Sequence, residues 1–262
     1  MKILFDYKEI YSEVISKGFF ICRNLIPLNE YKLVRDECLN FFETSSRRKT
    51  KLPKALRGNV GAGMKDNIGF TDNKKWKIYR ACYFPWNHID KNLFNTISLS
   101  RRLSGFRNEM IGIEKNTGSK LNDKGFIQYT SLSLYPKDGG FLYKHFDGYS
   151  KADINALIHF KVELTHKDLD YKKGGFYIWD NNGKEIDLSS QLNPTDVLFF
   201  NGANPHEVKP IKGGKGRIAL FEIPTHVTEE SMISNYSGEG DSKISKIRSK
   251  IKYYLNKGIS KL

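Results

Sequence analysis

The chain contains little cysteine, and this absence limits the kinds of site it can build. The three cysteines, Cys22, Cys38 and Cys82, are odd in number and form no Cys-X-X-Cys pair. This pattern argues against a disulfide framework and against a structural zinc site, both of which need closely spaced cysteines in sets. We therefore expect free thiols in a reducing compartment.

Long hydrophobic runs are also missing. No stretch of about 18 apolar residues occurs, so we expect no transmembrane helix and no membrane partner. The first ten residues, MKILFDYKEI, have an acidic residue at position 6 and lack the apolar core of a secretory signal. The sequence predicts a cytoplasmic protein.

Acidic residues are outnumbered by basic ones, 29 Asp and Glu against 43 Lys and Arg, which gives a net charge of +14. Such a charge is compatible with a polyanionic partner. The lysines, however, are spread through every segment, and compact basic clusters are few. They are Arg47-Arg48-Lys49 with Lys51, Arg101-Arg102 and the C-terminal tail. This distribution is typical of a solvated surface, so a nucleic acid is disfavoured as a partner. The oligomeric state is left open.

The sequence shows no internal repeat and no low-complexity linker, and we expect residues 1–262 to form one domain. The part before residue 126 is predicted to be helical and rich in loops. Helices are expected over 7–17, 28–43 and 89–104, where apolar residues recur at helical spacing. A long glycine-rich loop is expected over 56–73. The polar and then basic tail, 225–262, is expected to carry one docked helix.

From Phe126 the sequence changes to short apolar runs separated by turn signals such as Lys173-Gly-Gly175 and Gly213-Gly-Lys-Gly216. Strands are predicted over 126–135, 140–145, 154–164, 175–180, 196–201, 206–210 and 216–224. Short strands at this spacing favour two packed antiparallel sheets, a jelly roll, as the core over residues 126–224. The N-terminal helices are expected to pack on one sheet.

Three side chains in this part of the chain suit a metal ion. His145 and Asp147 stand two residues apart on an extended segment, so their side chains point the same way. His206 and Arg217 flank a later turn, and two adjacent antiparallel strands would bring them into one cavity. Two imidazoles and one carboxylate form the facial triad that holds non-heme Fe(II) with open coordination positions. An arginine nearby offers a fork that matches a carboxylate.

The chain from about residue 126 to 224 resembles the 2-oxoglutarate/Fe(II) oxygenase superfamily, and its prolyl-hydroxylase branch in particular. The resemblance rests on four motifs. They are Tyr135-Pro-Lys-Asp-Gly-Gly-Phe-Leu-Tyr-Lys-His145-Phe-Asp147, Gly174-Gly175, Asp196-Val-Leu-Phe-Phe with Asn204-Pro-His206-Glu-Val-Lys-Pro, and Gly216-Arg217. It implies a double-stranded β-helix, Fe(II) bound by His145, Asp147 and His206, and O2 and 2-oxoglutarate as co-substrates. Arg217 would pair with the C5 carboxylate of 2-oxoglutarate.

Further co-substrate contacts are assigned by position only. Tyr135 stands where the prolyl-hydroxylase branch has a co-substrate tyrosine. Lys161 is a candidate for a second polar group near the C5 carboxylate, and His159 and Glu163 share its face parity. Many family members carry Ser or Thr two residues after the arginine, whereas this chain has Ala219. Because the metal-binding aspartate is retained as Asp147, hydroxylation is favoured over halogenation.

These observations predict an enzyme that hydroxylates an unactivated C–H bond of a small molecule, such as an amino acid or a biosynthetic intermediate, with release of succinate and CO2. The loop 57–73 and the aromatic segment 76–86 are candidates for its lid and wall. A peptidyl, prolyl-type hydroxylase is the first alternative, suggested by the residues Asn204-Pro-His206-Glu-Val. A nucleic-acid dealkylase is suggested by the charge, but the chain after Arg217 lacks the second arginine and the polar pattern of the DNA-repair branch of the family. A non-catalytic jelly-roll binding module is the remaining alternative.

Overall fold

The computed structural model describes residues 6–47, 67–83, 93–118, 126–147 and 158–226. Within these residues the chain forms three helices and eleven strands. In chain order they are α1 (Tyr7–Lys17), β1 (Phe19–Cys22), α2 (Leu28–Arg47), β2 (Asn67–Asp72), β3 (Trp76–Tyr83), α3 (Phe94–Met110), β4 (Phe126–Tyr135), β5 (Phe141–His145), β6 (Ile158–Glu163), β7 (Lys173–Trp179), β8 (Glu185–Asp187), β9 (Val197–Asn201), β10 (His206–Lys212) and β11 (Arg217–His226).

The strands form one antiparallel sheet that curls into two layers. Their order is β1-β9-β6-β11-β4-β3-β5-β10-β7-β8, with β2 paired to the outer side of β3. β3 joins the layers, because residues 79–83 pair with β4 whereas residues 76–77 pair with β5. Closing the sheet in this way leaves few open edges, which is the usual benefit of a jelly roll. The predicted fold class is confirmed.

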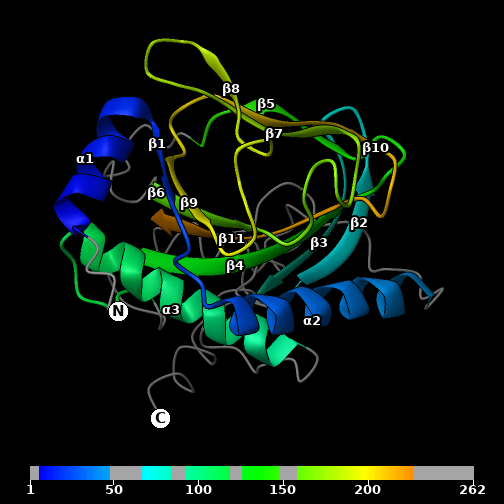
Figure 1. Ribbon diagram of the computed structural model, residues 1–262, viewed down its shortest axis with the longest axis horizontal. Helices are drawn as coiled ribbons and strands as arrows, with labels where there is room; N and C mark the ends of the chain where they lie inside the picture. Colours follow the sequence, from blue (N-terminus) through cyan, green and yellow to red (C-terminus); the bar gives the residue numbers. More distant parts are fainter. Residues whose placement is uncertain (1–5, 48–66, 84–92, 119–125, 148–157, 227–262) are drawn as a thin grey trace, which may run out of the picture.

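All three helices lie on the layer that contains β9, β6, β11 and β4. In Figure 1 α2 and α3 run beneath β4 and β11, while β5, β7 and β8 lie on the opposite side. A hydrophobic cluster joins this helical layer to the sheet. Its members include Val14, Val34, Leu99, Leu103, Phe160, Phe199 and Leu220. The prediction that N-terminal helices cover one sheet is therefore confirmed.

A second hydrophobic cluster fills the space between the two layers, with members such as Leu142, Phe176, Leu198, Phe200 and Val208. β6 contributes side chains to both sides, because alternate residues of a strand face opposite ways. Ile158, Phe160 and Val162 join the helical cluster. His159, Lys161 and Glu163 therefore face the interior between the layers, where they are also buried. Because β6 is fully buried and one of its faces is polar, the space between the two layers is a candidate functional site.

The three helices predicted before residue 126 are present, but the described part of this segment also contains three strands. β1, β2 and β3 were not predicted, and β2 occupies residues that were assigned to a glycine-rich loop. β1 pairs with β9, β2 pairs with β3, and β3 pairs with β4 and β5, so these strands depend on partners elsewhere in the chain more than on their own residue pattern. α2 and α3 end later than expected, at Arg47 and Met110, and α3 begins later, at Phe94.

Several expectations fall outside the described residues. The first part of the predicted loop, 56–66, the end of the aromatic segment, 84–86, and the tail helix after residue 226 are among them. Within the described ranges, no helix is long and apolar enough to cross a membrane.

Candidate metal and co-substrate site

His145 and His206 come together because β5 and β10 are neighbours in the sheet. The two residues are direct partners in the antiparallel register. Their ring centroids lie 4.4 Å apart. Asp147 follows two residues after the end of β5, and its backbone N–H donates to the carbonyl of Gly202 at 2.7 Å. This contact ties the His-X-Asp segment to the turn that leads into His206.

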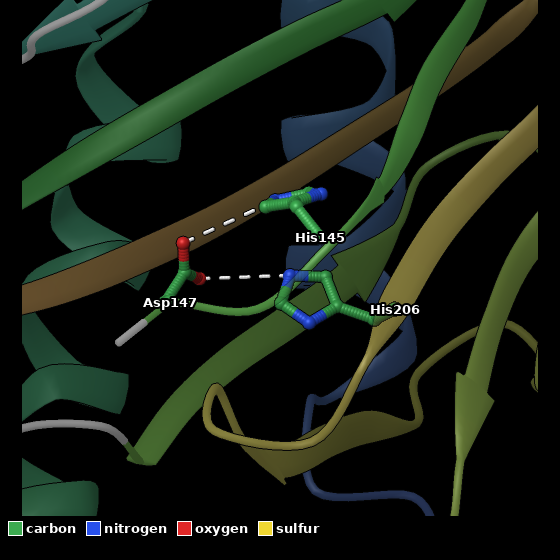
Figure 2. Close-up of side chains that lie close together, drawn as sticks. All are labelled: His145, Asp147 and His206. Atoms are coloured by element: carbon green, nitrogen blue, oxygen red, sulfur yellow. Dashed lines mark ion pairs between the residues drawn. The ribbon is translucent and has the colours of Figure 1, made fainter. Parts of the chain in front are cut away.

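The three side chains converge on one point, as Figure 2 shows. Nε2 of His145 lies 3.9 Å from Oδ1 of Asp147, and Nε2 of His206 lies 3.5 Å from Oδ2. One donor atom from each residue lies within 4.8 Å of the other two. Such spacing matches a shared ion, because ligand atoms about 2.0–2.2 Å from a metal are separated by roughly 3–4 Å. The structure thus brings together the three residues that the sequence predicted to lie close to one another.

Hydrogen bonds to the backbone orient both imidazoles. Nδ1 of His145 lies 2.7 Å from the carbonyl of Tyr143, and Nδ1 of His206 lies 2.9 Å from the carbonyl of Asn204. A carbonyl only accepts, so each Nδ1 carries the proton and each Nε2 is left with a lone pair. Backbone acceptors of this kind fix the tautomer and ring orientation of metal-binding histidines. The donor set of two neutral nitrogens and one carboxylate fits Fe(II).

A third histidine, His159, lies beside this cluster. Its Nε2 is 3.6 Å from Oδ2 of Asp147, and its ring stacks on Phe200 with centroids 5.1 Å apart. Within the described part of the chain neither ring nitrogen has a hydrogen-bond partner. His159 is not part of the group whose donor atoms all lie within 4.8 Å. It therefore contacts the aspartate from outside the candidate ligand set.

Burial keeps two of these histidines neutral. Burial lowers the pKa of His206 to about 3, and neighbouring His145 lowers it further. Burial likewise lowers the pKa of His159 to about 4, against the opposing charge of Asp147. A neutral imidazole is the form that binds a metal ion.

Arg217 and Tyr135 are partners in the register of β11 and β4. The guanidinium carbon of Arg217 lies 5.1 Å from the centre of the Tyr135 ring. Both side chains are buried, so two of the three residues that the sequence assigned to the co-substrate lie together. Tyr135 also shares a side-chain hydrogen bond with Arg80. Burial raises the pKa of Tyr135.

Arg217 already has an acidic partner. Its Nη2 donates to Oε1 of Glu163 on β6. Burial acts to lower the pKa of Arg217, but Glu163, Tyr171 and Tyr135 together oppose it and the pKa is raised. Glu163 is the register partner of Ala219, the position where the resembled family often has Ser or Thr. A carboxylate therefore lies opposite the residue that lacks the expected hydroxyl.

Lys161 is the second buried cation of this region. Its Nζ lies 3.8 Å from Oε1 of Glu163 and 3.2 Å from the centre of the Phe176 ring. Burial and then the charge of Arg217 lower the pKa of Lys161 well below its usual value, while Glu163 opposes this effect. Cations over aromatic faces are stabilised when they are desolvated, which compensates part of the cost of burial.

The sequence identified the candidate ligands and both cations, but it gave Glu163 and His159 no role of their own. The only available signal was the alternation of β6, which places His159, Lys161 and Glu163 on one face. Glu163 contacts Arg217 and His159 contacts Asp147. These contacts depend on the pairing of strands that are distant in sequence.

No protein-family model matches this sequence, and no curated protein matches it. Solved structures do match the fold. A prolyl-4-hydroxylase from Pseudomonas putida has a TM-score of 0.55 at 15% identity, over 85% of this chain and 100% of that chain. AviO1 from Streptomyces viridochromogenes has a TM-score of 0.57 at 8% identity, over 87% and 98%.

A third match is a prolyl hydroxylase from Trichoplax adhaerens in complex with a peptide fragment of the hypoxia-inducible-factor oxygen degradation domain. Its TM-score is 0.53 at 16% identity, over 86% of this chain and 90% of that chain. At these identities the likeness concerns the fold alone, which this chain shares with two prolyl hydroxylases and with AviO1. The resemblance inferred from the sequence is thereby supported at the level of architecture.

Proposed function

We propose that this protein is an Fe(II)- and 2-oxoglutarate-dependent oxygenase. The observation that carries the proposal is the convergence of His145, Asp147 and His206, with both Nε2 atoms free to bind a metal ion. The fold is that of prolyl hydroxylases, which supports the same conclusion. A purely structural histidine pair would not need two backbone acceptors that both turn Nε2 toward one carboxylate.

His145, Asp147 and His206 would hold the iron on one side and leave its other positions to 2-oxoglutarate and O2. When bound, iron and 2-oxoglutarate would supply, with O2, the oxidative decarboxylation that yields succinate and CO2 and the oxidant for a substrate C–H bond. The chain itself binds and orients. We assign the far carboxylate of 2-oxoglutarate to the region of Arg217 and Lys161, with Tyr135 as a further contact. Their burial excludes water, which strengthens interactions with a carboxylate.

For the substrate we propose a small molecule, such as an amino acid or a biosynthetic intermediate. Peptidyl hydroxylation is the second candidate, and exposed aromatic side chains next to the metal ligands favour it. Phe146 is 65% exposed and Tyr143 is 38% exposed. The Tyr143 ring stacks on His145 with centroids 5.3 Å apart. An open aromatic rim of this kind would accept a ring or a segment of an extended chain.

The test is anaerobic addition of Fe(II) and then 2-oxoglutarate to the metal-free protein, followed in the visible spectrum. The proposal predicts a weak metal-to-ligand charge-transfer band that is lost in His145→Ala. Lys144→Ala is the matched control, because its side chain lies over Trp179 rather than beside the triad. A shift of the band with free amino acids would support the small-molecule substrate, and a shift with prolyl peptides alone would support the second candidate. No band in the wild type would contradict the proposed function.

A further inference from the structure

His159 is a buried polar side chain whose hydrogen-bonding capacity is unused within the described part of the chain. The residue is 1% exposed, and neither Nδ1 nor Nε2 has a hydrogen-bond partner there. An imidazole, neutral or charged, carries a proton on at least one ring nitrogen, so His159 brings a donor into the interior. A buried donor without an acceptor destabilises a fold, and such an exception indicates a functional role.

The acceptor that the structure brings within reach of this donor is the carboxylate of Asp147. Nε2 of His159 lies 3.6 Å from Oδ2 of Asp147. A hydrogen bond from nitrogen to oxygen is about 2.9 Å long, so the two atoms are about 0.7 Å too far apart. The Asp147 side chain is 33% exposed and lies two residues beyond the end of β5, so a small rotation of the carboxylate closes the gap.

His159, in contrast, is held in place on two sides. Its ring stacks on Phe200, with centroids 5.1 Å apart and an angle of 23° between the planes. Next to Nε2 lies Gly202, where an added Cβ would be 2.5 Å from this nitrogen and 3.1 Å from Cβ of Asp147. The carbonyl of Gly202 also accepts the backbone N–H of Asp147 at 2.7 Å. The imidazole is therefore the fixed member of the pair, and the carboxylate is the movable one.

We infer that His159 is a positioning residue for the metal site. Its Nε2–H donates to Oδ2 of Asp147 and holds the carboxylate in the orientation that binds the ion. A partner of this kind limits the rotation of a metal ligand, which lowers the cost of ordering it when the metal binds. His159 is not itself a ligand, because neither of its nitrogens belongs to the group of donor atoms that all lie within 4.8 Å of one another. This inference rests on the metal site of the proposed function and does not involve the co-substrate.

Two variants of similar size separate hydrogen bonding from packing. His159→Gln keeps a side-chain N–H that can donate to Asp147, whereas His159→Met has a chain of the same length without such a donor. The measurement is calorimetric binding of Co(II) to the metal-free protein, without O2 and without 2-oxoglutarate. His159→Met is expected to weaken Co(II) binding about ten- to a hundredfold, the usual cost of losing the partner of a metal ligand. His159→Gln is expected to bind within about threefold of the wild type, because the donor is retained.

Thermal melting of the metal-free variants distinguishes positioning from a purely structural role. His159→Met removes a buried donor that lacks an acceptor, so its melting temperature is expected to equal or exceed that of the wild type. A residue needed only for packing would lose stability and metal affinity together. At saturating Co(II), the visible bands of His159→Met are expected to keep their wild-type positions, because the ligand set is unchanged.

The inference is overturned if His159→Met binds Co(II) as tightly as the wild type, or if His159→Gln binds as weakly as His159→Met. A parallel fall of melting temperature and affinity in His159→Met would overturn it in favour of packing. Shifted Co(II) bands in that variant would overturn it by making His159 a ligand. Absence of Co(II) binding to the wild type is a separate outcome, because it would contradict the metal site of the proposed function and the inference with it.

Discussion

His145 and His206 lie directly opposite each other in the antiparallel pair of β5 and β10. Asp147 approaches the same point through its backbone bond to Gly202. An ion bound by the three residues would therefore join two segments of the fold, the His-X-Asp segment at the end of β5 and the start of β10. Anything that binds the folded state and not the unfolded chain stabilises the fold.

We predict that Co(II) or Mn(II), used as oxygen-stable substitutes for Fe(II), raises the melting temperature of the metal-free protein. At a hundredfold excess over the dissociation constant the gain is about 2.7 kcal/mol. His206→Ala should abolish the increase, whereas Lys144→Ala should retain it. An equal increase in His206→Ala would show that the metal binds at another place.

Gly202 has no room for a side chain. A Cβ atom there would lie 2.5 Å from Nε2 of His159 and 3.1 Å from Cβ of Asp147. Because His159 is buried and cannot swing aside, Gly202→Ala is expected to cost about 1–3 kcal/mol of stability and to weaken metal binding by displacing Asp147. Chemical denaturation and Mn(II) titration measure the two effects.

Gly105→Ala is the matched control for that substitution. The three atoms nearest to its added Cβ all belong to the flexible side chain of Lys115, and the residue lies inside α3. Alanine is the better helix former, so this variant should be neutral or up to about 1 kcal/mol more stable. Equal losses in both variants would count against a specific role for the space beside His159.

Tyr135→Phe tests the co-substrate assignment of the tyrosine. The ring packs beside Arg217, so removing only the hydroxyl leaves the packing in place. If the hydroxyl donates to the co-substrate, the dissociation constant for 2-oxoglutarate rises about tenfold, the usual effect of losing one such hydrogen bond. Mn(II) affinity should stay unchanged, because Tyr135 is not among the candidate metal ligands. Calorimetry with each ligand separately checks both expectations.

The buried histidines predict acid sensitivity of the metal-free protein. The pKa of His159 is lowered to about 4 in the folded state, below the value of about 6.5 expected for an unfolded chain. The unfolded chain therefore binds more protons between these values. The resulting stability is fully present above about pH 6.5 and is lost as the pH falls toward about 4.

The loss from this one group is on the order of 3 kcal/mol, and His206, with a pKa of about 3, adds to it. His159→Gln should reduce the slope of stability against pH between about pH 6.5 and 4 and leave the slope above pH 7 unchanged. Denaturant unfolding over this range is the measurement. An unaltered acid slope would mean that His159 is protonated in the folded protein.

The sequence alone predicted the strands from residue 126 onward except β8, because alternation and turn residues are local properties of the chain. β8 has only three residues, too few to show an alternating pattern. The sequence also predicted the group of three candidate metal ligands that the structure brings together. The His-X-Asp spacing places two donors on one face of an extended segment, and the chemistry of the side chains indicates the ion.

β1, β2 and β3 could not be predicted in the same way. β1 exists as a strand because β9 supplies its hydrogen-bond partners, β2 because β3 does, and β3 because β2, β4 and β5 do. Strand formation of this kind depends on tertiary context more than on the residues of the strand itself.

The partners inside the site were likewise decided only by the tertiary structure. Alternation along β6 sends His159, Lys161 and Glu163 into the interior, and this was readable from the sequence. That Glu163 meets Arg217 and His159 meets Asp147 follows from the register of β6 against β11 and β9. Local sequence determines which face of a strand a side chain occupies, whereas the residue it meets is determined by the pairing of strands far apart in the chain.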